Sequence, residues 1–385
     1  MDASKSPADV SHRSGGGEKG LPKVAIIVLN WNGWEDTLEC LESLQRLQYP
    51  EFLIIVVDNG SGNDSVRRIK EWCAGRIRVH EKHVTPGTSP KPVQLIEYDR
   101  EVAERGGDAS KEQRIENVPA NRKMVLIHAG GNLGFSGGNN IAIRYAMETR
   151  RFKYVWLLNN DALAAGDALS NLIRVAEAEK GSGLLGSKLL DYFRPERPPN
   201  TGGFHRIWPF RSKVPIRAPG QDFQRTTWLS GASLLARVRA VETIGNLDDR
   251  FFLYGEDKDW CLRATRKGWD LFCVLTSTVW HKWGRSSNSV RSHGSFFGKA
   301  ISRLSREAFE STMYYESRNG VYFYKKHYPL YFVLYLIFRT LHLLLQVVLY
   351  DDRKMSRIAV VLKGAWDGLL GRMGKARAQE RAGNP

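Results

Sequence analysis

The sequence is poor in cysteine and has no paired cysteine motif. Its four cysteines, Cys40, Cys73, Cys261 and Cys273, show no CxxC spacing, so neither a zinc site nor a disulfide framework is indicated. A reduced cytosolic setting fits this usage. Residues 1–20 are polar and glycine-rich and lack the apolar core of a signal peptide. We therefore expect a disordered leader followed by a domain that stays in the cytoplasm.

Acidic residues are also scarce relative to basic ones. The chain has 41 Asp and Glu against 57 Lys and Arg, a formal charge of +16. Such a charge suits anionic lipid and diphosphate-bearing ligands. No recognised nucleic-acid-binding module or basic-aromatic repeat is present, so no nucleic-acid partner is predicted. With 385 residues, 42% of them hydrophobic, the chain is long enough for one large domain plus an appendage.

Two apolar runs near the amino end each stop at polar residues. Val24–Leu29 ends at Asn30, and Phe52–Val57 ends at Asp58. Between them, leucines recur every third residue as on one face of a helix, which predicts strand, helix, strand. In a parallel sheet, ligands bind just beyond the carboxyl ends of the strands, where Asn30 and Asp58 would lie. The alternative for Asp58 is an ordinary turn residue in Asp-Asn-Gly.

A third apolar run ends in a similar way. The segment Tyr154–Asp161 reads YVWLLNND and finishes with Asn159, Asn160 and Asp161. A carboxylate at a strand end can ligate a hard divalent cation while its neighbours hold a ribose. The tripeptide is an Asn-x-Asp version of the Asp-x-Asp signature. Alone it matches by chance too often to carry weight, but here it follows two comparable strand ends.

Three carboxylates are packed into the segment Phe251–Arg263, FFLYGEDKDWCLR. Glu256, Asp257 and Asp259 follow an aromatic run and a glycine. Like charges this close repel unless a cation, a hydroxyl substrate or an arginine accepts them, which indicates an active-site loop. The alternative is the solvated first turn of a helix, where negative charge suits the helix dipole.

Taken together, these segments resemble a known family. The ordered motifs are similar to those of inverting family 2 glycosyltransferases, and more narrowly of the rhamnosyltransferase-like branch in cell-envelope polysaccharide assembly. The likeness runs from Lys23 to Ser287. It implies a GT-A type α/β fold over residues 21–300, with a Rossmann-like nucleotide-binding half and a mostly parallel central sheet. The motifs are VLNWNG, VVDNGS, GGNLGFSGGNN, LLNNDA, WLSGAS, FFLYGEDKDWCLR and VWHKWGRSS.

The resemblance implies roles for the strand ends. Asp58 would accept the N3 hydrogen of uracil or thymine, and Asn30 would line the same base pocket. Asp161 would coordinate Mg²⁺ or Mn²⁺ bridging the donor diphosphate. Asn159 and Asn160, on the nucleotide side, depart from the acidic form of the motif and lower its negative charge.

The resemblance also implies the reacting groups. Asp257 would be the general base, with Glu256 as the supporting or alternative carboxylate, because an inverting transfer needs a group to take the acceptor hydroxyl proton. His281, in Trp-His-Lys-Trp-Gly, would complete the metal site, although an isolated histidine is more often structural. We expect Asp259 and Arg263 to organise the loop through a charge-assisted contact.

Two glycine-containing motifs are assigned to the substrates. GGNLGFSGGNN, with Gly134 and Gly137, lacks the dinucleotide-binding spacing, and we expect its backbone to approach the donor rather than to form a mobile surface loop. By resemblance WLSGAS belongs near the acceptor, which involves Trp228, Ser230 and Gly231.

The remaining segments flank this core. Residues 80–121, rich in charge, Pro and Gly, are interpreted as an insertion or lid. Residues 301–385 form a basic, helical region whose stretch Pro329–Tyr350 is long enough to span a bilayer. Arg339, His342 and Gln346 share one helical face, which favours a helix in the membrane interface or packed on the enzyme over a simple span. A buried core helix is the further alternative.

The sequence therefore predicts an enzyme that transfers one sugar from a dTDP- or UDP-sugar to a hydroxyl of a lipid-linked saccharide, at the cytoplasmic face of the cell membrane. Three alternatives are weighed against it. A sugar-nucleotide nucleotidyltransferase would carry a lysine-containing phosphate loop, which NWNGWED lacks. A processive synthase would need several transmembrane helices and a Gln-x-x-Arg-Trp motif. A non-catalytic nucleotide-sugar-binding scaffold would have no use for Asp257. No residue specifies the sugar or the oligomeric state.

Overall fold

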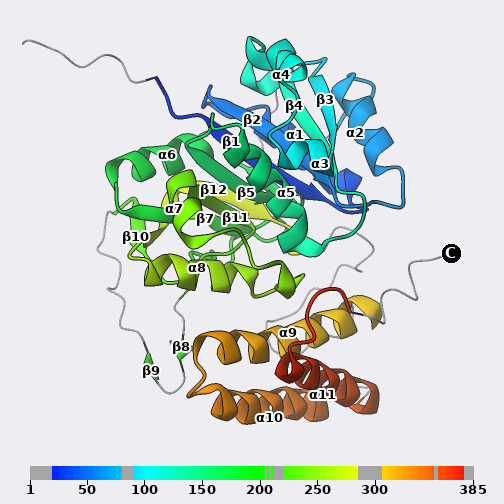
Figure 1. Ribbon diagram of the computed structural model, residues 1–385, viewed down its shortest axis with the longest axis vertical. Coiled ribbons are helices and arrows are strands. Elements are labelled where there is room, and N and C mark those ends of the chain that lie inside the picture. Colours follow the sequence, from blue (N-terminus) through cyan, green and yellow to red (C-terminus); the bar gives the residue numbers. More distant parts are fainter. Residues whose placement is uncertain are drawn as a thin grey trace, which may run out of the picture.

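The computed structural model describes most of the chain as one α/β domain above three C-terminal helices (Figure 1). The described residues are 20–79, 90–203, 206–207, 210–211, 221–284, 306–350 and 354–376. The expected leader, apart from residue 20, the first ten residues of the expected insertion and Arg285–Ser287 of the last motif lie outside them.

Five parallel strands form the amino-terminal half of the central sheet. Their order in the sheet is β5-β1-β2-β4-β3. The two predicted apolar runs become β1 and β2, which pair in register so that Asn30 lies opposite Asp58. Both strands are buried on their two faces, as continuous Val and Ile runs predict. The strands are β1 (Val24–Asn30), β2 (Phe52–Asp58), β3 (Gln94–Asp99), β4 (Lys123–His128) and β5 (Tyr154–Asn159).

The sheet continues beyond β5 with strands of mixed direction. β11 (Ser233–Arg237) runs antiparallel to both β5 and β7 (Ser182–Asp191). β12 (Asp270–His281) runs parallel to β7 and also pairs with the short β6 (Ala162–Ala164) and β10 (Phe223–Arg225). β6 follows directly after β5, so its pairing with β12 brings Asp161 and His281 to the same place. A separate two-stranded hairpin joins β8 (Arg206–Ile207) and β9 (Phe210–Arg211).

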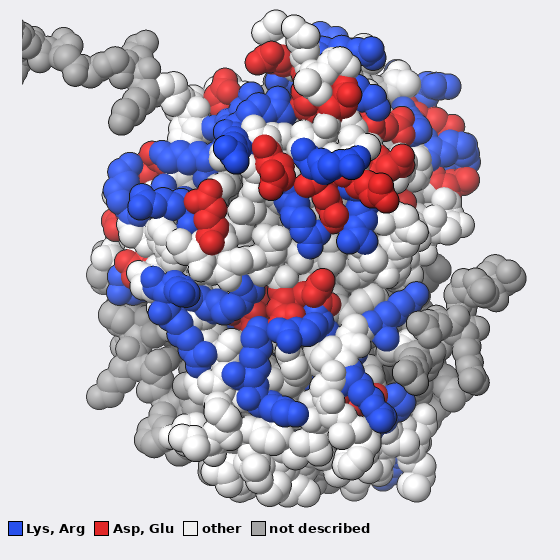
Figure 2. Space-filling model, viewed as in Figure 1, with Lys and Arg blue, Asp and Glu red and all other residues white. Residues whose placement is uncertain are grey.

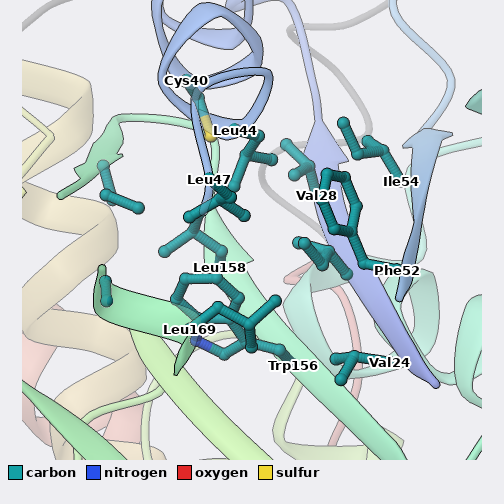
Figure 3. Close-up of a cluster of buried hydrophobic side chains, with 14 of the residues drawn as sticks. Val24, Val28, Cys40, Leu44, Leu47, Phe52, Ile54, Trp156, Leu158 and Leu169 are labelled. Atoms are coloured by element: carbon teal, nitrogen blue, oxygen red, sulfur yellow. The ribbon is translucent and has the colours of Figure 1, made fainter. Parts of the chain in front are cut away.

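Helices cover both faces of the sheet, and alternate residues of β1 serve two separate cores. Val24, Ile26 and Val28 pack with the leucines of α1 and with α2 and α6 (Figure 3). Ala25 and Ile27 face α5, α7 and α8. The helices are α1 (Trp34–Leu44), α2 (Ser65–Cys73), α3 (Arg100–Glu104), α4 (Ala109–Glu116), α5 (Gly134–Glu148), α6 (Ala168–Ala178), α7 (Val238–Ile244) and α8 (Glu256–Arg266), with 3-10 turns at Ala120–Arg122 and Asp249–Phe251.

The described part of the stretch interpreted as an insertion adds to the edge of the sheet. Residues 94–99 form β3, the last strand in the sheet order, and α3 and α4 follow it. β4 and β2 separate this strand from β1.

The C-terminal region folds into α9 (Arg306–His327), α10 (Phe332–Tyr350) and α11 (Lys354–Leu370). α9 lies beside α8, and α10 lies farthest from the sheet (Figure 1). α9 ends at His327 and α10 begins at Phe332, so Pro329 lies in the connection between them, where its missing N–H breaks no helical hydrogen bond. Glycines permit close helix contacts, since a Cβ at Gly368 would collide with the carbonyl of Arg318 on α9.

Candidate active site

The carboxyl ends of β1 and β2 build one polar cluster. Asn30 Nδ2 donates to Asp58 Oδ1 at 2.9 Å and to Ser61 Oγ at 3.1 Å, while its Oδ1 accepts from Thr37 at 2.8 Å. The backbone N–H of Ser61 donates to the other carboxylate oxygen of Asp58 at 3.2 Å. Asn30 and Asp58 are both buried. The predicted base-pocket residues are therefore brought together and fixed by hydrogen bonds.

The end of β5 and the end of β12 build a second polar cluster. His281 Nε2 lies 3.0 Å from Asp161 Oδ1 and 3.3 Å from Asn159 Nδ2, and the N–H of Gly284 donates to Asp161 Oδ2 at 2.8 Å. Burial alone would raise the pKa of Asp161, but His281, Gly284 and Lys282 bring it below its usual value. The two residues expected to ligate a metal are thus in contact.

Asn160 joins the two clusters. Its amide donates to the carbonyl of Gly33 at 3.2 Å and to Thr37 Oγ1 at 3.1 Å, and Thr37 in turn donates to Asn30. A Cβ at Gly33 would lie 2.9 Å from the Asn160 amide, so the turn after β1 needs a glycine for this approach. Asn160 therefore hydrogen-bonds to the turn after β1, a contact that the sequence did not predict.

The glycine-rich motif forms a turn and the start of a helix rather than the surface loop that was the alternative. Gly134 begins α5, so Gly137 and its neighbours are helical. The physical reason is packing: a Cβ at Gly138 would overlap Leu29 of β1, and one at Gly134 would overlap Phe252. Asn59, after β2, receives the N–H of Leu133 at 3.0 Å and so holds the start of α5 beside the base cluster. The glycines bring α5 close to the site.

The three acids begin helix α8, as the alternative interpretation proposed, but they are not all solvated. Glu256 and Asp259 are buried and Asp257 is half-buried. Burial and then the negative charge of Asp257 raise the pKa of Glu256 to about 8. Burial also raises the pKa of Asp257, but its carboxylate accepts backbone N–H groups from Lys258 at 2.7 Å and Gly231 at 3.3 Å. These donors favour the charged form of Asp257.

Gly231 connects this acid to the metal-side cluster. Its N–H donates to Asp257 Oδ2, and the carbonyl of the next residue, Ala232, accepts from the N–H of Asn159 at 3.0 Å. The base candidate and the metal candidate therefore border one site.

Trp228 and Ser230, expected on the acceptor side, directly precede the Gly231–Ala232 segment that joins Asp257 to Asn159. Lys258 Nζ is 5.8 Å from the centre of the Trp228 ring. Ser230 Oγ accepts from the N–H of Ala232 at 3.3 Å, which shapes the turn that presents Gly231 to Asp257.

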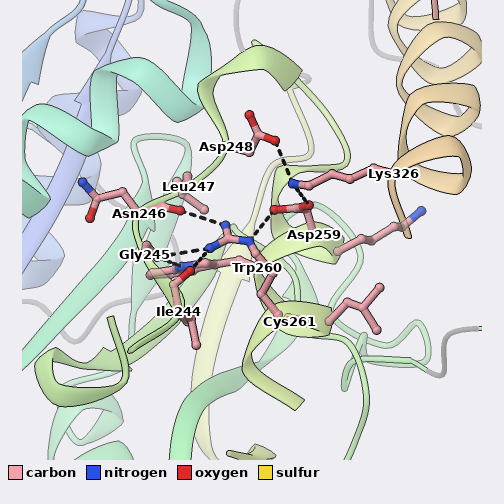
Figure 4. Close-up of polar contacts among 12 residues, drawn as sticks. Ile244, Gly245, Asn246, Leu247, Asp248, Asp259, Trp260, Cys261 and Lys326 are labelled. Atoms are coloured by element: carbon pink, nitrogen blue, oxygen red, sulfur yellow. Dashed lines mark hydrogen bonds and ion pairs between the residues drawn. The ribbon is translucent and has the colours of Figure 1, made fainter. Parts of the chain in front are cut away.

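Asp259 and Arg263 form an ion pair of 2.7 Å, and Figure 4 shows Asp259 facing Lys326 as well. Arg263 also donates to the carbonyls of Ile244 and Asn246. Asp259 Oδ1 meets Lys326 and His327 of α9 as well. Burial opposes ionisation, but His327, Arg263 and Lys326 together hold the pKa of Asp259 well below its usual range.

Several residues around the site were not identified from the sequence. Lys282 forms ion pairs with Asp36 at 2.6 Å and with Glu39 at 3.0 Å beside the metal-side cluster. Thr37 could have been noticed as a hydroxyl on the buried side of α1. Lys282 could also have been noticed, because it directly follows His281 in the motif. Its partners Asp36 and Glu39 could not, because they lie far away in the sequence.

Comparisons with known proteins identify the family of this chain. The model of the family described as Glycosyltransferase like family 2 matches residues 22–309. The low-salt glycan biosynthesis hexosyltransferase Agl10 of Haloferax volcanii is 29% identical over 163 residues, which are 42% of this chain and 52% of Agl10. The rhamnosyltransferase WbbL of Escherichia coli K12 is 27% identical over 208 residues, 50% of this chain and 74% of WbbL. The chain thus spans about half the length of Agl10.

A search of solved structures gives a further match. The mannosyltransferase PcManGT from Pyrobaculum calidifontis, in complex with GDP-Man and Mn²⁺, shares 14% identity and a TM-score of 0.49, covering 91% of this chain and 88% of PcManGT. The expected α/β fold of GT-A type, with a mostly parallel central sheet, is confirmed by the topology and the family match.

Proposed function

This chain belongs to the family described as Glycosyltransferase like family 2, and from that premise we propose that it is a rhamnosyltransferase-like enzyme. It transfers one sugar, with inversion, from a dTDP- or UDP-sugar to a hydroxyl of a lipid-linked saccharide at the cytoplasmic face of the membrane. The observation that carries the proposal is the short bridge through Gly231 and Ala232 that holds Asp257 beside the end of β5.

The donor nucleotide is assigned to the cluster at the ends of β1 and β2. Asn30 is buried and its two amide hydrogens are donated to Asp58 and Ser61, so Asn30 orders Asp58, whose carboxylate is the acceptor offered to the base edge. A carboxylate oxygen accepts from the N3 hydrogen of uracil or thymine, which fits the pyrimidine donor proposed here. The N1 and N2 hydrogens of guanine would also be accepted by a carboxylate, and the test below therefore includes GDP-sugars.

The donor diphosphate is assigned to the cluster of Asp161 and His281. Among the described residues no group of three His, Cys, Asp or Glu gathers around one point. Two side chains nevertheless fit Mg²⁺ or Mn²⁺, because such ions commonly take one or two protein ligands plus substrate phosphates. The Asn159 Oδ1 and His281 Nδ1 atoms are buried without a protein partner, which leaves polar capacity at the site. When bound, the cation would neutralise charge on the leaving diphosphate.

The acceptor hydroxyl is assigned to Asp257. Its carboxylate takes the hydroxyl proton while the acceptor oxygen forms a bond to the anomeric carbon and the bond from that carbon to the diphosphate oxygen breaks. Attack from the side opposite the leaving group inverts the anomeric centre. Glu256, whose pKa lies near 8, keeps its proton near neutral pH and leaves the single negative charge on Asp257.

The membrane is assigned to the outer face of α10. This helix is long and apolar enough to cross a bilayer by composition, with a mean hydropathy of 2.0 over Phe332–Leu349. Its inner face packs on α9 and α11 through Leu343 and Val347. The opposite face is apolar and exposed, and Figure 2 shows few charges over this end of the molecule. The exposed residues of this face are Val333, Leu334, Ile337, Phe338, Leu341, Leu345, Val348 and Leu349, and Leu330 is exposed just before the helix.

The polar residues of α10 support an in-plane position. Arg339 NH2 donates to Glu316 of α9 at 3.3 Å, so the charge that would oppose a simple span is held by the protein. His342 is exposed, and the side chain of Gln346 lies outside the described residues. Lys326 bonds to Asp248 and Asp259 instead of facing lipid, whereas Lys354 is exposed at the start of α11.

The test is donor binding and hydrolysis across UDP-, dTDP- and GDP-sugars, with and without Mn²⁺, on the full-length wild type and on Asp257→Asn. The proposal predicts metal-dependent selection of one pyrimidine donor, with hydrolysis lost and binding kept in the variant. Binding without turnover in the wild type, even with lipid-linked acceptors, would favour the scaffold alternative. Normal turnover by Asp257→Asn would remove this residue as the base.

A further inference from the structure

The segment just before the catalytic acids has a backbone conformation that its own residues do not favour. Phe252 has φ +61°, Tyr254 +68° and Gly255 +96°. Positive φ is unfavourable for a residue other than glycine, and it persists only where the surroundings impose it. The direction in which α8 starts, and therefore the position of Asp257, depends on what imposes this conformation.

Helix α9 supplies the main contacts. Asn319 Nδ2 donates to the carbonyls of Phe251 at 3.0 Å, Leu253 at 2.7 Å and Tyr254 at 2.6 Å, so two N–H groups are shared among three oxygens of one strained turn. Asn319 is buried, with 2% of its surface exposed. The carbonyl of Phe252, between these, accepts from the N–H of Phe135 at the start of α5.

Arg318 fixes the orientation of this amide. Its Nε donates to Asn319 Oδ1 at 2.9 Å, and one terminal nitrogen donates to the Phe251 carbonyl at 3.0 Å. The guanidinium is buried against the rings of Tyr314 and Tyr315, at 5.4 and 4.8 Å from their centres. An amide held by its own oxygen in this way cannot flip to present the oxygen to the carbonyls.

The same helix also holds the far side of the acids. Lys326 and His327, at the end of α9, contact Asp259 on the first turn of α8 (Figure 4). Helix α9 therefore contacts the chain on both sides of Glu256 and Asp257. Asn319 contacts the turn before them, and Lys326 and His327 contact Asp259 after them. α10 and α11 pack directly on this helix, since Gly320 lies under the Tyr335 ring and Gly364 against the carbonyl of Tyr314.

We propose that Asn319 is a positioning residue for the transfer reaction, and that α9 links the base on α8 to the membrane-facing helices. The inference rests on the proposed role of Asp257. It assigns the C-terminal helices a part in catalysis in addition to membrane attachment: the turn Phe251–Gly255 takes its working shape only while α9 is seated.

The test compares Asn319→Ala with the matched control Ser317→Ala in the full-length protein. Ser317 is also buried on α9, but its hydroxyl donates to the Val361 carbonyl of α11 at 2.8 Å and does not touch the turn. For Asn319→Ala we expect kcat to fall roughly 10- to 100-fold, because small misplacements of a reacting group have effects of this size. Donor Kd should stay within about threefold, because no donor-side residue contacts Asn319.

Hydrogen exchange of residues 251–257 is measured on the same proteins. Faster exchange in Asn319→Ala but not in Ser317→Ala, with the loss in kcat, supports the proposal. Equal kcat losses in both variants, unchanged exchange in the turn, or an unchanged kcat would each overturn it. If Asn319→Ala does not fold, Asn319→Gln replaces it. This variant keeps the amide but places it one methylene farther from the helix backbone, and the same results support or overturn the proposal. A wild type that transfers no sugar refutes the proposed function, and the exchange comparison then still decides whether Asn319 holds the turn.

Discussion

The substitution Glu256→Gln tests which of two adjacent carboxyl groups carries the working charge. The pKa of Glu256 is raised from 4.5 to about 8 by burial and by Asp257, so a neutral amide copies the form that predominates at pH 7. Because the folded-state pKa is the higher one, the folded chain binds more protons than the unfolded chain, and stability falls as pH rises from 4.5 to 8. At about 1.4 kcal/mol per pH unit, this penalty is roughly 3 kcal/mol at pH 7.

Glu256→Gln should lack that penalty. Urea-denaturation free energies measured from pH 4 to pH 9 should agree near pH 4 and favour the variant by roughly 3 kcal/mol at pH 7. Its kcat should stay within about threefold of wild type, whereas the isosteric control Asp257→Asn should lose roughly 100-fold or more. Parallel stability curves, or an equal loss of turnover in both variants, would refute the assignment of the proton to Glu256.

Three further substitutions probe the metal-side cluster, the α8–α9 contact and the membrane face. Asp161→Ala should weaken Mn²⁺-dependent donor binding in calorimetry, and an unchanged difference between runs with and without Mn²⁺ would remove Asp161 from the site. Asp259→Asn should cost about 3–5 kcal/mol of unfolding free energy, because Arg263, Lys326 and His327 lose a buried partner. The depressed pKa of Asp259 means that this loss should shrink as the solution is acidified below the ordinary aspartate range; a constant difference at all pH values would contradict it. Leu341→Ser should lower binding to anionic vesicles roughly 10-fold or more, while Leu21→Ser, at a similar exposure of 54% against 57%, should leave binding unchanged; equal effects would argue against the α10 face.

Sequence periodicity was sufficient for the strands that carry the site. Continuous apolar runs located β1, β2 and β5 within about a residue, because strands buried on both faces need no polar alternation. The polar residues that end them then had to lie at one sheet edge, and Asn30 and Asp58 are in fact hydrogen-bonded there.

Features that depend on tertiary contacts could not be predicted in this way. The segment of three acids gave equal support to a loop and to a helix start, and only packing against α9 decides that Asp259 is buried while Asp257 stays half-exposed. The glycines of α5 indicated a close backbone approach to the donor, but the approach of Leu29 to Gly138 depends on tertiary packing that no local pattern shows. Asn319 is more than sixty residues from the turn it contacts, and no local pattern connects them.

The central claim is a single inverting transfer with Asp257 as the base. The most direct measurement is the anomeric configuration of the sugar transferred to a lipid-linked saccharide, determined by NMR of the product formed by the full-length enzyme from its selected donor. The account predicts a configuration opposite to that of the donor, and no product from Asp257→Asn. Retention of configuration, or product formed at the wild-type rate by that variant, would contradict it.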